Sequence, residues 1–370
     1  MTRIALLTGN EMIAAGALAA GCDFFSGYPI TPASEIQAEM VRQLPGHGGL
    51  ALAAPDEISA LSYAVGAALA GRRAMTATSG PGFSLMVETF QYALMTETPV
   101  VIVVSQRLGP ATGAATQGAQ GDVQFVANAT SGGYPFPVLC PVDGRDAYVL
   151  TSEAFALAES LRTPVVLLTD KETSKTAETV DLDALPPVDV VGRPTASEDA
   201  PFVPYGIESL EDVPAFAPVG GRHKVTVTGS AHDHRGRLQK NDPESLRQLH
   251  HLALKVLARP ERTTRVRWTR RPGARTLLVS YGISARAARQ AARTADEPLD
   301  LLEVLSLFPV PVQALREAAV GMERVWVIEE NHPGLYAREV RLAVPDADVR
   351  HLGDVGAMIR PDAILEALRS

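Results

Sequence analysis

Short apolar runs alternate with helical patterns along the first half of the chain, and this alternation restricts the possible folds more than any other feature. The apolar runs are short, partly β-branched and end in turn or polar residues, as buried strands do. They cover residues 72–80, 99–106, 135–141 and 163–171, and helical patterns cover residues 57–71, 83–97 and 146–161. Such a strand–helix–strand order predicts an α/β fold, with a parallel sheet between two layers of helices.

The same alternation returns near the C-terminus. Strand patterns cover residues 275–282, 299–311 and 323–331, and helical patterns cover residues 284–293, 312–320, 335–344 and 361–370. The chain has 370 residues, which is enough for two or three domains with cores of their own. We therefore expect two doubly wound domains, over residues 1–190 and 263–370.

The segment between these domains, residues 191–262, has a different character. Prolines cluster in its first part, a two-strand pattern covers residues 223–236, and a charged helical pattern covers residues 242–258. The segment contains too many apolar and aromatic residues for a disordered linker. We expect an ordered connector that lies over another surface.

The composition narrows the range of partners. Apolar residues make up 46% of the chain and charged residues 21%, as in soluble globular proteins, and the net charge is −8. This charge argues against a nucleic acid or an anionic membrane as partner. The apolar N-terminal segment is interrupted by Gly9–Glu11, so we interpret it as a buried strand and a small-residue helix rather than a signal peptide. We expect a cytoplasmic protein.

Metal chemistry has little support in this chain. Its two cysteines, Cys22 and Cys140, are too few for an iron–sulfur cluster, which needs about four thiolates. We expect two reduced thiols, because nothing suggests secretion. The alternating His232 and His234 are a weak metal signal, and we interpret them as solvated or structural. We therefore predict no metal site.

The sequence GYPITP contains two prolines that bracket two residues. Proline fixes its own φ and favours an extended residue before it, so Pro29 and Pro32 hold Tyr28 and Thr31 in defined places. The hydroxyl of Thr31 would then be positioned for a ligand. The alternative is an ordinary turn between a strand and a helix, with Ser34 as the N-cap.

Two helix starts are further candidates. In PDEI, Asp56 can cap a helix and Glu57 lies in the first turn of that helix. A carboxylate in the first turn either interacts favourably with the helix dipole or binds a ligand nitrogen. In TSGPGFS, residues 78–84, the glycines either let a cofactor approach the backbone or form a tight turn. The latter stretch has neither a Walker lysine nor a GxGxxG pattern, so it predicts nucleotide binding only weakly.

A long Gly-, Ala-, Thr- and Gln-rich stretch covers residues 105–125. A loop of this length inside a compact domain is usually functional. Arg107 stands where a strand ends, and its forked guanidinium suits a carboxylate ligand. The alternative is a surface arginine.

These motifs, in this order, resemble the alpha subunit of 2-oxoacid:ferredoxin oxidoreductases, most of all the 2-oxoglutarate type. The resemblance rests on GYPITP, PDEISALSYAVGAALAG, MTATSGPGFSLMVETFQYALMTETPVVIVVSQR, TQGAQGDV and TPVVLLTDK. It implies a pyrimidine-binding thiamine diphosphate domain followed by a transketolase C-terminal-like domain. It also implies that the cofactor site is shared with a beta subunit, which carries Mg²⁺, the diphosphate site and a [4Fe–4S] cluster.

The resemblance assigns roles to residues. Glu57 matches the carboxylate that activates the cofactor, Thr31 would lie beside the oxo-acid group, and Arg107 would receive a substrate carboxylate. We expect the cofactor to contact Tyr28, Pro29, Ile30, Glu57, Ser79, Gly80 and Phe83. The implied reaction is a reversible, coenzyme A-dependent oxidative decarboxylation that passes electrons to ferredoxin, in a heterotetramer that can include a separate gamma subunit.

Alternatives remain open at this point. Leu108 stands where relatives usually have glycine, so a branched-chain or aryl 2-oxoacid is a second candidate substrate. A non-oxidative thiamine enzyme would normally keep both halves of the cofactor site in one chain, and the diphosphate signature is absent here. A non-catalytic scaffold subunit is the remaining alternative, although Thr31, Glu57 and Arg107 are all present.

Overall fold

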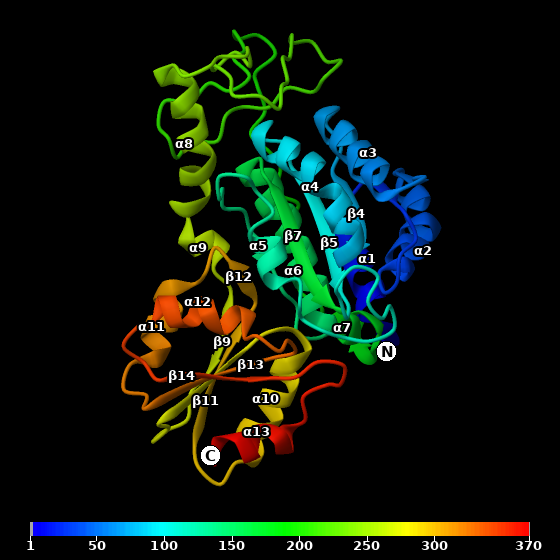
Figure 1. Cartoon of the computed structure of the whole chain (residues 1–370). Helices are drawn as coiled ribbons and strands as arrows, with labels where there is room; N and C mark the ends of the chain where they lie inside the picture. The colour runs from blue at the N-terminus through cyan, green and yellow to red at the C-terminus, as the bar shows by residue number, and fades with distance from the viewer. Residues whose placement is uncertain (1–2, 370) are drawn as a thin grey trace.

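Two α/β units and an irregular connector make up the computed structural model of the protein, which describes residues 3–369 (Figure 1). Ser370, the end of the last predicted helix, lies outside the described residues. Within the described range, no helix combines the length and apolar character needed to cross a membrane.

The first unit is built on a seven-stranded sheet with the order β12-β6-β7-β5-β4-β2-β3. All its strands are parallel except β12, which pairs antiparallel with β6. The strands are β2 (Phe24–Gly27), β3 (Leu50–Ala53), β4 (Ala74–Ser79), β5 (Val100–Gln106), β6 (Val138–Leu139), β7 (Pro164–Asp170) and β12 (Ser306–Phe308). The central strands are buried along their whole length, which explains their continuous apolar runs.

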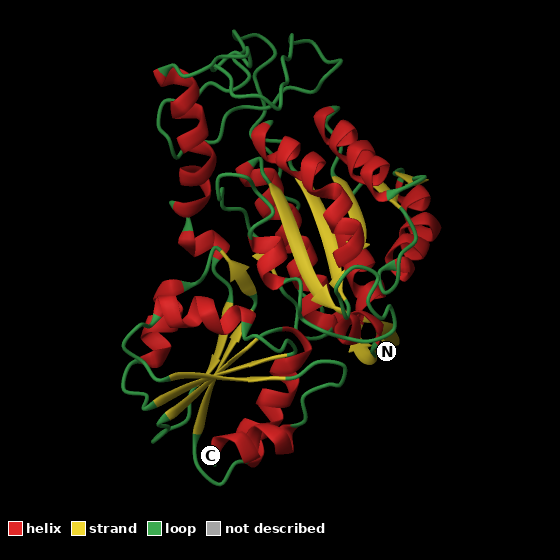
Figure 2. Cartoon of the chain, in the orientation of Figure 1, coloured by secondary structure: helices red, strands yellow, loops and turns green. Residues whose placement is uncertain are grey.

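Helices cover both faces of this sheet (Figure 2). One layer packs through a core cluster that contains Ile13, Ile36 and Leu150, and the other through a cluster that contains Leu61, Phe83 and Val126. The first layer is α1 (Gly9–Ala19), α2 (Ser34–Gln43) and α6 (Gly144–Leu161), and the second is α3 (Glu57–Leu69), α4 (Gly80–Met95) and α5 (Val123–Ala127). A short α7 (Lys171–Lys175) follows β7, and 3₁₀ turns cover Leu44–His47 and Leu182–Ala184.

Two predicted strands differ from the structure. The strand expected over residues 135–141 shrinks to two residues, because Pro135, Pro137 and Pro141 cannot donate to a ladder. The first strand, β1 (Ile4–Thr8), exists but is not buried. It pairs only with β8 (Ala177–Asp181), and Ile4 and Leu6 are 58% and 69% exposed.

The second unit contains a five-stranded sheet with the order β14-β13-β10-β11-β9, in which only β9 is antiparallel. Its strands are β9 (Val266–Thr269), β10 (Thr276–Ser280), β11 (Leu299–Val304), β13 (Arg324–Glu329) and β14 (Val349–Gly353). Core clusters place α11 (Val312–Ala319) and α12 (Leu335–Ala343) on one face, and α10 (Gly282–Thr294) and α13 (Pro361–Leu368) on the other. The prediction of two doubly wound units is confirmed.

The two units share a core. The run at residues 299–311, expected to be one strand, divides into β11 in the second sheet and β12 in the first. One hydrophobic cluster continues from Val138 and Cys140 of the first unit to Tyr281 and Tyr336 of the second. The second unit is therefore fixed against the first.

The connector is mostly irregular up to α8 (Pro243–Leu257) and α9 (Pro260–Thr263). The predicted charged helix is confirmed as α8. The strand pair predicted over residues 223–236 is wrong, because this segment forms only an isolated bridge between His232 and Leu238. The segment instead contacts the first unit through side chains, as at His232, whose Nε2 lies 3.4 Å from the Met95 carbonyl oxygen.

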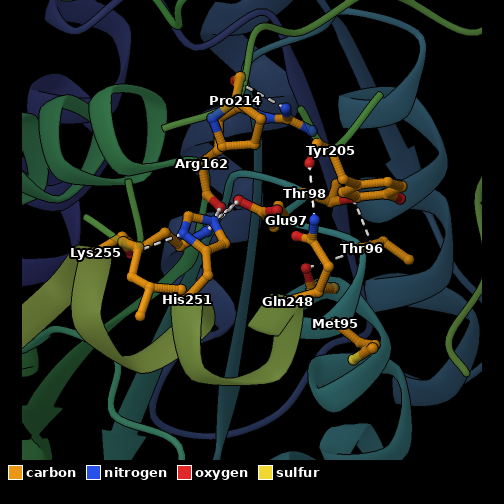
Figure 3. Close-up of polar contacts among 12 residues, drawn as sticks. Met95, Thr96, Glu97, Thr98, Arg162, Tyr205, Pro214, Gln248, His251 and Lys255 are labelled. Atoms are coloured by element: carbon orange, nitrogen blue, oxygen red, sulfur yellow. Dashed lines mark hydrogen bonds and ion pairs between the residues drawn. The ribbon is translucent and has the colours of Figure 1, made fainter. Parts of the chain in front are cut away.

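Buried charges fasten α8 to the first unit (Figure 3). The carboxylate of Glu97, which is 1% exposed, accepts hydrogen bonds from Lys255 Nζ at 2.6 Å and lies 3.1 Å from His251 Nε2. Lys255 also donates to the carbonyl of Arg162 at 2.9 Å, and Arg162 donates to the Pro214 carbonyl. Burial alone would raise the pKa of Glu97, but the Lys255 ammonium and His251 outweigh it and hold that pKa well below its usual range.

Candidate active site

The GYPITP turn follows β2 at the carboxyl edge of the first sheet, and two side chains hold it from behind. Arg107, directly after β5, donates from Nη1 to the Thr31 carbonyl at 2.7 Å. Asn10 donates from Nδ2 to the Pro32 carbonyl at 2.8 Å. Arg107 is only 7% exposed, so the surface-arginine alternative is wrong. Ser34 is the first residue of α2 and caps nothing, because Ala33 occupies the N-cap position.

The outer side of this turn is open. Tyr28, Pro29 and Thr31 are exposed and Ile30 is half-buried. The residues predicted to meet the cofactor or the substrate therefore lie at an accessible surface, next to a buried arginine.

Glu57 begins α3 close to this edge. Asp56 is the N-cap, as predicted, and its Oδ1 accepts a hydrogen bond from the Ser59 amide at 2.7 Å. Glu57 itself is 7% exposed, and no hydrogen bond to its carboxylate forms within residues 3–369. A mostly buried carboxylate without a partner is suited to bind a ligand donor.

The Gly-Pro-Gly start of α4 lies between two carboxyl groups. A Cβ atom on Gly82 would lie 2.9 Å from Glu57 Oε1, and one on Gly80 would lie 2.5 Å from Asp122 Oδ2. Side chains of this chain therefore lie against both glycines. Both carboxyl groups lie beside the N-terminal end of a helix of 16 residues, where the helix dipole favours negative charge.

The other two predicted cofactor residues, Ser79 and Phe83, are fully buried. Phe83 packs edge-on against Phe90 and Phe125, with ring centroids 5.7 and 5.6 Å apart. In this chain its ring supports α4 from the core side.

Several buried polar atoms at this edge have no hydrogen-bond partner among the described residues, and four of them form one group. They belong to residues at the ends of β4 and β5 and in the loop that follows: Ser79 Oγ, Gln106 Nε2, Arg107 Nε and Asp122 Oδ2. Buried polar groups are nearly always paired in native proteins, so such a group of orphans indicates a missing ligand or water. Sequence reasoning missed Gln106 and Asp122, although both lie in or beside the loop that it marked as functional.

The loop also reaches the second unit, through Gln120. Its side chain donates to Asp170 and to the Tyr281 carbonyl, both at 3.2 Å, and accepts from Ser284 Oγ and the Glu330 amide, both at 2.9 Å. Gln120 thereby links the active-site loop to the start of α10 and the end of β13.

The two cysteines play no part in this site. Cys22 and Cys140 are unpaired and buried, as expected for reduced thiols. Burial raises the pKa of the Cys22 thiol to about 12 and that of Cys140 well above its usual value, so both are inert. Within residues 3–369, no three His, Cys, Asp or Glu side chains gather in a way that could hold a metal ion.

Comparison with known proteins identifies the family. A model of the thiamine diphosphate-binding domain of pyruvate flavodoxin/ferredoxin oxidoreductases matches residues 15–248, and one of core domain II of pyruvate:ferredoxin oxidoreductase matches residues 274–360. The chain belongs to the 2-oxoacid:ferredoxin oxidoreductase family. Within it, the chain corresponds to the alpha subunit.

Two curated relatives match over almost their whole length. The 2-oxoglutarate synthase subunit KorA of Methanothermobacter marburgensis is 37% identical over 100% of this chain and 99% of its own. The ketoisovalerate oxidoreductase subunit VorB of Methanothermobacter thermautotrophicus is 34% identical over 98% of this chain and 97% of its own.

Solved structures agree with the family. The 2-oxoglutarate:ferredoxin oxidoreductase of Magnetococcus marinus, solved with 2-oxoglutarate, coenzyme A and succinyl-CoA, superposes with a TM-score of 0.94 at 26% identity. The match covers 100% of this chain and 65% of that one. A split-gene transketolase matches with a TM-score of 0.57 at 14% identity, over 98% of this chain and 95% of that chain, which supports the transketolase-like fold alone.

The residues at the sheet edge fit part of a thiamine diphosphate site. The unpaired carboxylate of Glu57 can accept from a ring nitrogen, and the orphaned Ser79, Gln106 and Arg107 atoms can bind further polar groups. The exposed turn at Tyr28 leaves this edge open to a ligand or to another subunit.

Proposed function

We propose that this chain is the pyrimidine-binding half of a thiamine diphosphate-dependent enzyme that converts 2-oxoglutarate and coenzyme A to succinyl-CoA, reversibly, with ferredoxin as electron acceptor. The observation that carries the proposal is the position of Glu57, buried and unpaired against the start of α4. The 37% identity to a 2-oxoglutarate synthase subunit supports this substrate.

Each residue has a part in the proposed mechanism. When bound, thiamine diphosphate supplies a nucleophilic carbon for the oxo group and accepts the electrons released on decarboxylation. Glu57 would hold the pyrimidine ring through a hydrogen bond between its carboxylate and a ring nitrogen, and this bond would favour loss of a proton from the cofactor. Tyr28, Pro29 and Ile30 would form the accessible surface against which that ring rests, and the buried Ser79, Gly80 and Phe83 would support it from the core side.

Arg107 receives the substrate carboxylate in this proposal. Its Nη1 is already bonded to the Thr31 carbonyl, and its Nε is buried without a hydrogen-bond partner, so the guanidinium has an unsatisfied donor that a carboxylate would pair. The same hydrogen bond fixes the backbone of Thr31, whose hydroxyl would lie beside the reacting group. Small displacements of such groups slow a reaction strongly.

The remaining parts of the proposal concern other chains. A beta subunit would supply the diphosphate site with Mg²⁺ and the [4Fe–4S] cluster, and a separate gamma subunit could complete the complex. The cytoplasmic location, the heterotetramer and the boundaries at residues 190 and 262 stay predictions.

A branched-chain 2-oxoacid is the second candidate substrate. It is supported by the 34% identity to a ketoisovalerate oxidoreductase subunit. The two candidates differ in whether the substrate has a second carboxylate.

Purification of this chain alone and together with its partner chain separates these possibilities. We expect reduction of a viologen dye only by the combined chains, with thiamine diphosphate, coenzyme A and 2-oxoglutarate present. Faster reduction with 2-oxoisovalerate would favour the second candidate. Failure of every 2-oxoacid, or full activity of the isolated chain, would contradict the proposal.

A further inference from the structure

Asp122 is a second carboxyl group at the site, and the mechanism so far gives it no role. It lies at the end of the active-site loop, where its amide donates to Gln106 Oε1 at 3.0 Å. Its carboxylate packs against Gly80, and its Oδ2 is buried without a hydrogen-bond partner. A structural carboxylate at a loop end would normally have such a partner.

Hydrogen bonds hold the residues that precede and follow Asp122 in the sequence. Two residues earlier, Gln120 is fixed by its four side-chain bonds, by its amide to the Glu330 carbonyl at 2.7 Å and by its carbonyl to Asn331 Nδ2 at 3.1 Å. Two residues later, Gln124 donates to Glu339 at 2.7 Å and to the Leu335 carbonyl at 3.1 Å. These bonds fix the backbone on both sides of Asp122 and keep the residue beside Gly80 and Gln106.

The surroundings decide the charge of Asp122. Burial raises its pKa to about 6, and the positive charge of Arg107 opposes this rise. The nearby elements carry charges of both signs. The acidic groups are Glu57 across the start of α4, Glu339 on α12, Glu330 after β13 and Asp170 at the end of β7, and the basic groups are Lys171 after β7 and Arg338 and Arg341 on α12. The cation that lowers the pKa of Asp122 is Arg107.

Arg107 is also the group that the proposed function assigns to the substrate. An ionised Asp122 would neutralise part of the Arg107 charge and repel an incoming carboxylate, whereas a protonated Asp122 would do neither and could donate a hydrogen bond to it. We propose that Asp122 gates the 2-oxoacid site, because a substrate carboxylate occupies Arg107 only when Asp122 carries a proton. This inference rests on the proposed function of Arg107.

The test compares the wild-type complex with Asp122→Asn, which keeps the shape and removes the charge. For wild type, we expect the KM for 2-oxoglutarate to rise severalfold per pH unit between pH 6.5 and 8.5, since the protonated fraction of a group with a pKa near 6 falls about tenfold per unit. For Asp122→Asn the KM should be nearly flat over this range. At pH 7.5 it should be about 30-fold lower than in wild type, with kcat little changed, because a pKa near 6 leaves about one Asp122 in 30 protonated at that pH.

A binding measurement gives the same comparison without turnover. Calorimetric titration of 2-oxoglutarate into the complex depleted of thiamine diphosphate should show the same pH dependence of Kd in wild type and its absence in Asp122→Asn. Asp354→Asn removes an exposed carboxylate of the second unit and should behave like wild type.

The outcomes separate this inference from the proposed function. A wild-type KM and Kd that do not change with pH would overturn the gate, even if the variant failed to assemble. The same result follows if Asp122→Asn keeps the wild-type profile or weakens binding at every pH. Complete lack of 2-oxoacid turnover in wild type would overturn the proposed function as well.

Discussion

Replacing Lys255 by methionine tests whether the buried charges hold the connector on the first unit. The ammonium of Lys255 is fully buried, 2.6 Å from Glu97 Oε2 and 2.9 Å from the Arg162 carbonyl. Methionine has a similar length and no charge, so the variant leaves the buried Glu97 carboxylate with His251 as its hydrogen-bond partner and with the charge of Arg162 nearby. Removing one partner of a buried pair costs about 3–5 kcal/mol, because the remaining charge has been taken out of water without compensation.

This cost should be visible in thermal unfolding. For a unit of this size, 1 kcal/mol corresponds to about 2–4 °C in Tm, so we expect Lys255→Met to lower the first transition by roughly 6–20 °C. The control is Arg222→Met, which breaks the exposed pair with Glu198. Exposed pairs contribute about 0–1 kcal/mol, so this variant should unfold near the wild-type temperature.

The double variant Glu97→Gln/Lys255→Met completes the test. Without the carboxylate there is no unpaired charge, so its loss of stability should be smaller than the sum of the single losses by about 0.5–3 kcal/mol. Circular dichroism at 222 nm measures the transitions of wild type, Glu97→Gln, Lys255→Met, the double variant and Arg222→Met. Additive losses, or a Lys255→Met transition as high as that of Arg222→Met, would refute the role of this ion pair.

Three further predictions concern the active site and pH. Glu57→Ala should abolish 2-oxoacid-dependent dye reduction while the complex still assembles on size-exclusion chromatography, and full activity would refute its role. Arg107→Ala should raise the KM for 2-oxoglutarate about 10- to 100-fold, since hydrogen bonds to charged groups contribute about 1.5–3 kcal/mol, and an unchanged KM would count against carboxylate binding. Because the folded-state pKa of Glu97 is depressed, its stabilisation is present above the unfolded pKa near 4.3 and is lost as the pH falls below it. The difference in Tm between wild type and Glu97→Gln should therefore be constant from pH 6.5 to 5 and shrink toward pH 3; a constant difference down to pH 3 would contradict the ion-pair explanation.

The sequence predicted the parts of the fold that depend on local pattern. Central strands such as β5 and β7 are buried on both faces, so their apolar runs are continuous and their limits are clear. Prediction failed where the pairing partner decides which sheet a strand joins. Residues 299–311 form one apolar run, yet the chain changes sheets within it, and β12 pairs with β6 more than 160 residues earlier in the sequence. No local property of the run distinguishes its two halves.

The candidate site was predictable only in part, for a similar reason. Glu57 and Arg107 stand at a helix start and a strand end, and these positions meet at the carboxyl edge of any parallel sheet. Asp122 has no such mark, because its closeness to Gly80 depends on the path by which a long loop returns to the sheet. An acidic residue in a polar loop looks the same in the sequence whether it is buried or exposed.

The position of that loop depends on contacts that leave almost no trace in the sequence. Gln120 makes six hydrogen bonds, and three of them go to main-chain atoms, the carbonyl of Tyr281 and the amide and carbonyl of Glu330. A main-chain partner is available at any residue type, so the second unit can hold the loop without a recognisable pattern of side chains at the point of contact. The geometry around Arg107 and Asp122 is therefore partly a property of the second unit, although every residue that we assign to the reaction lies in the first.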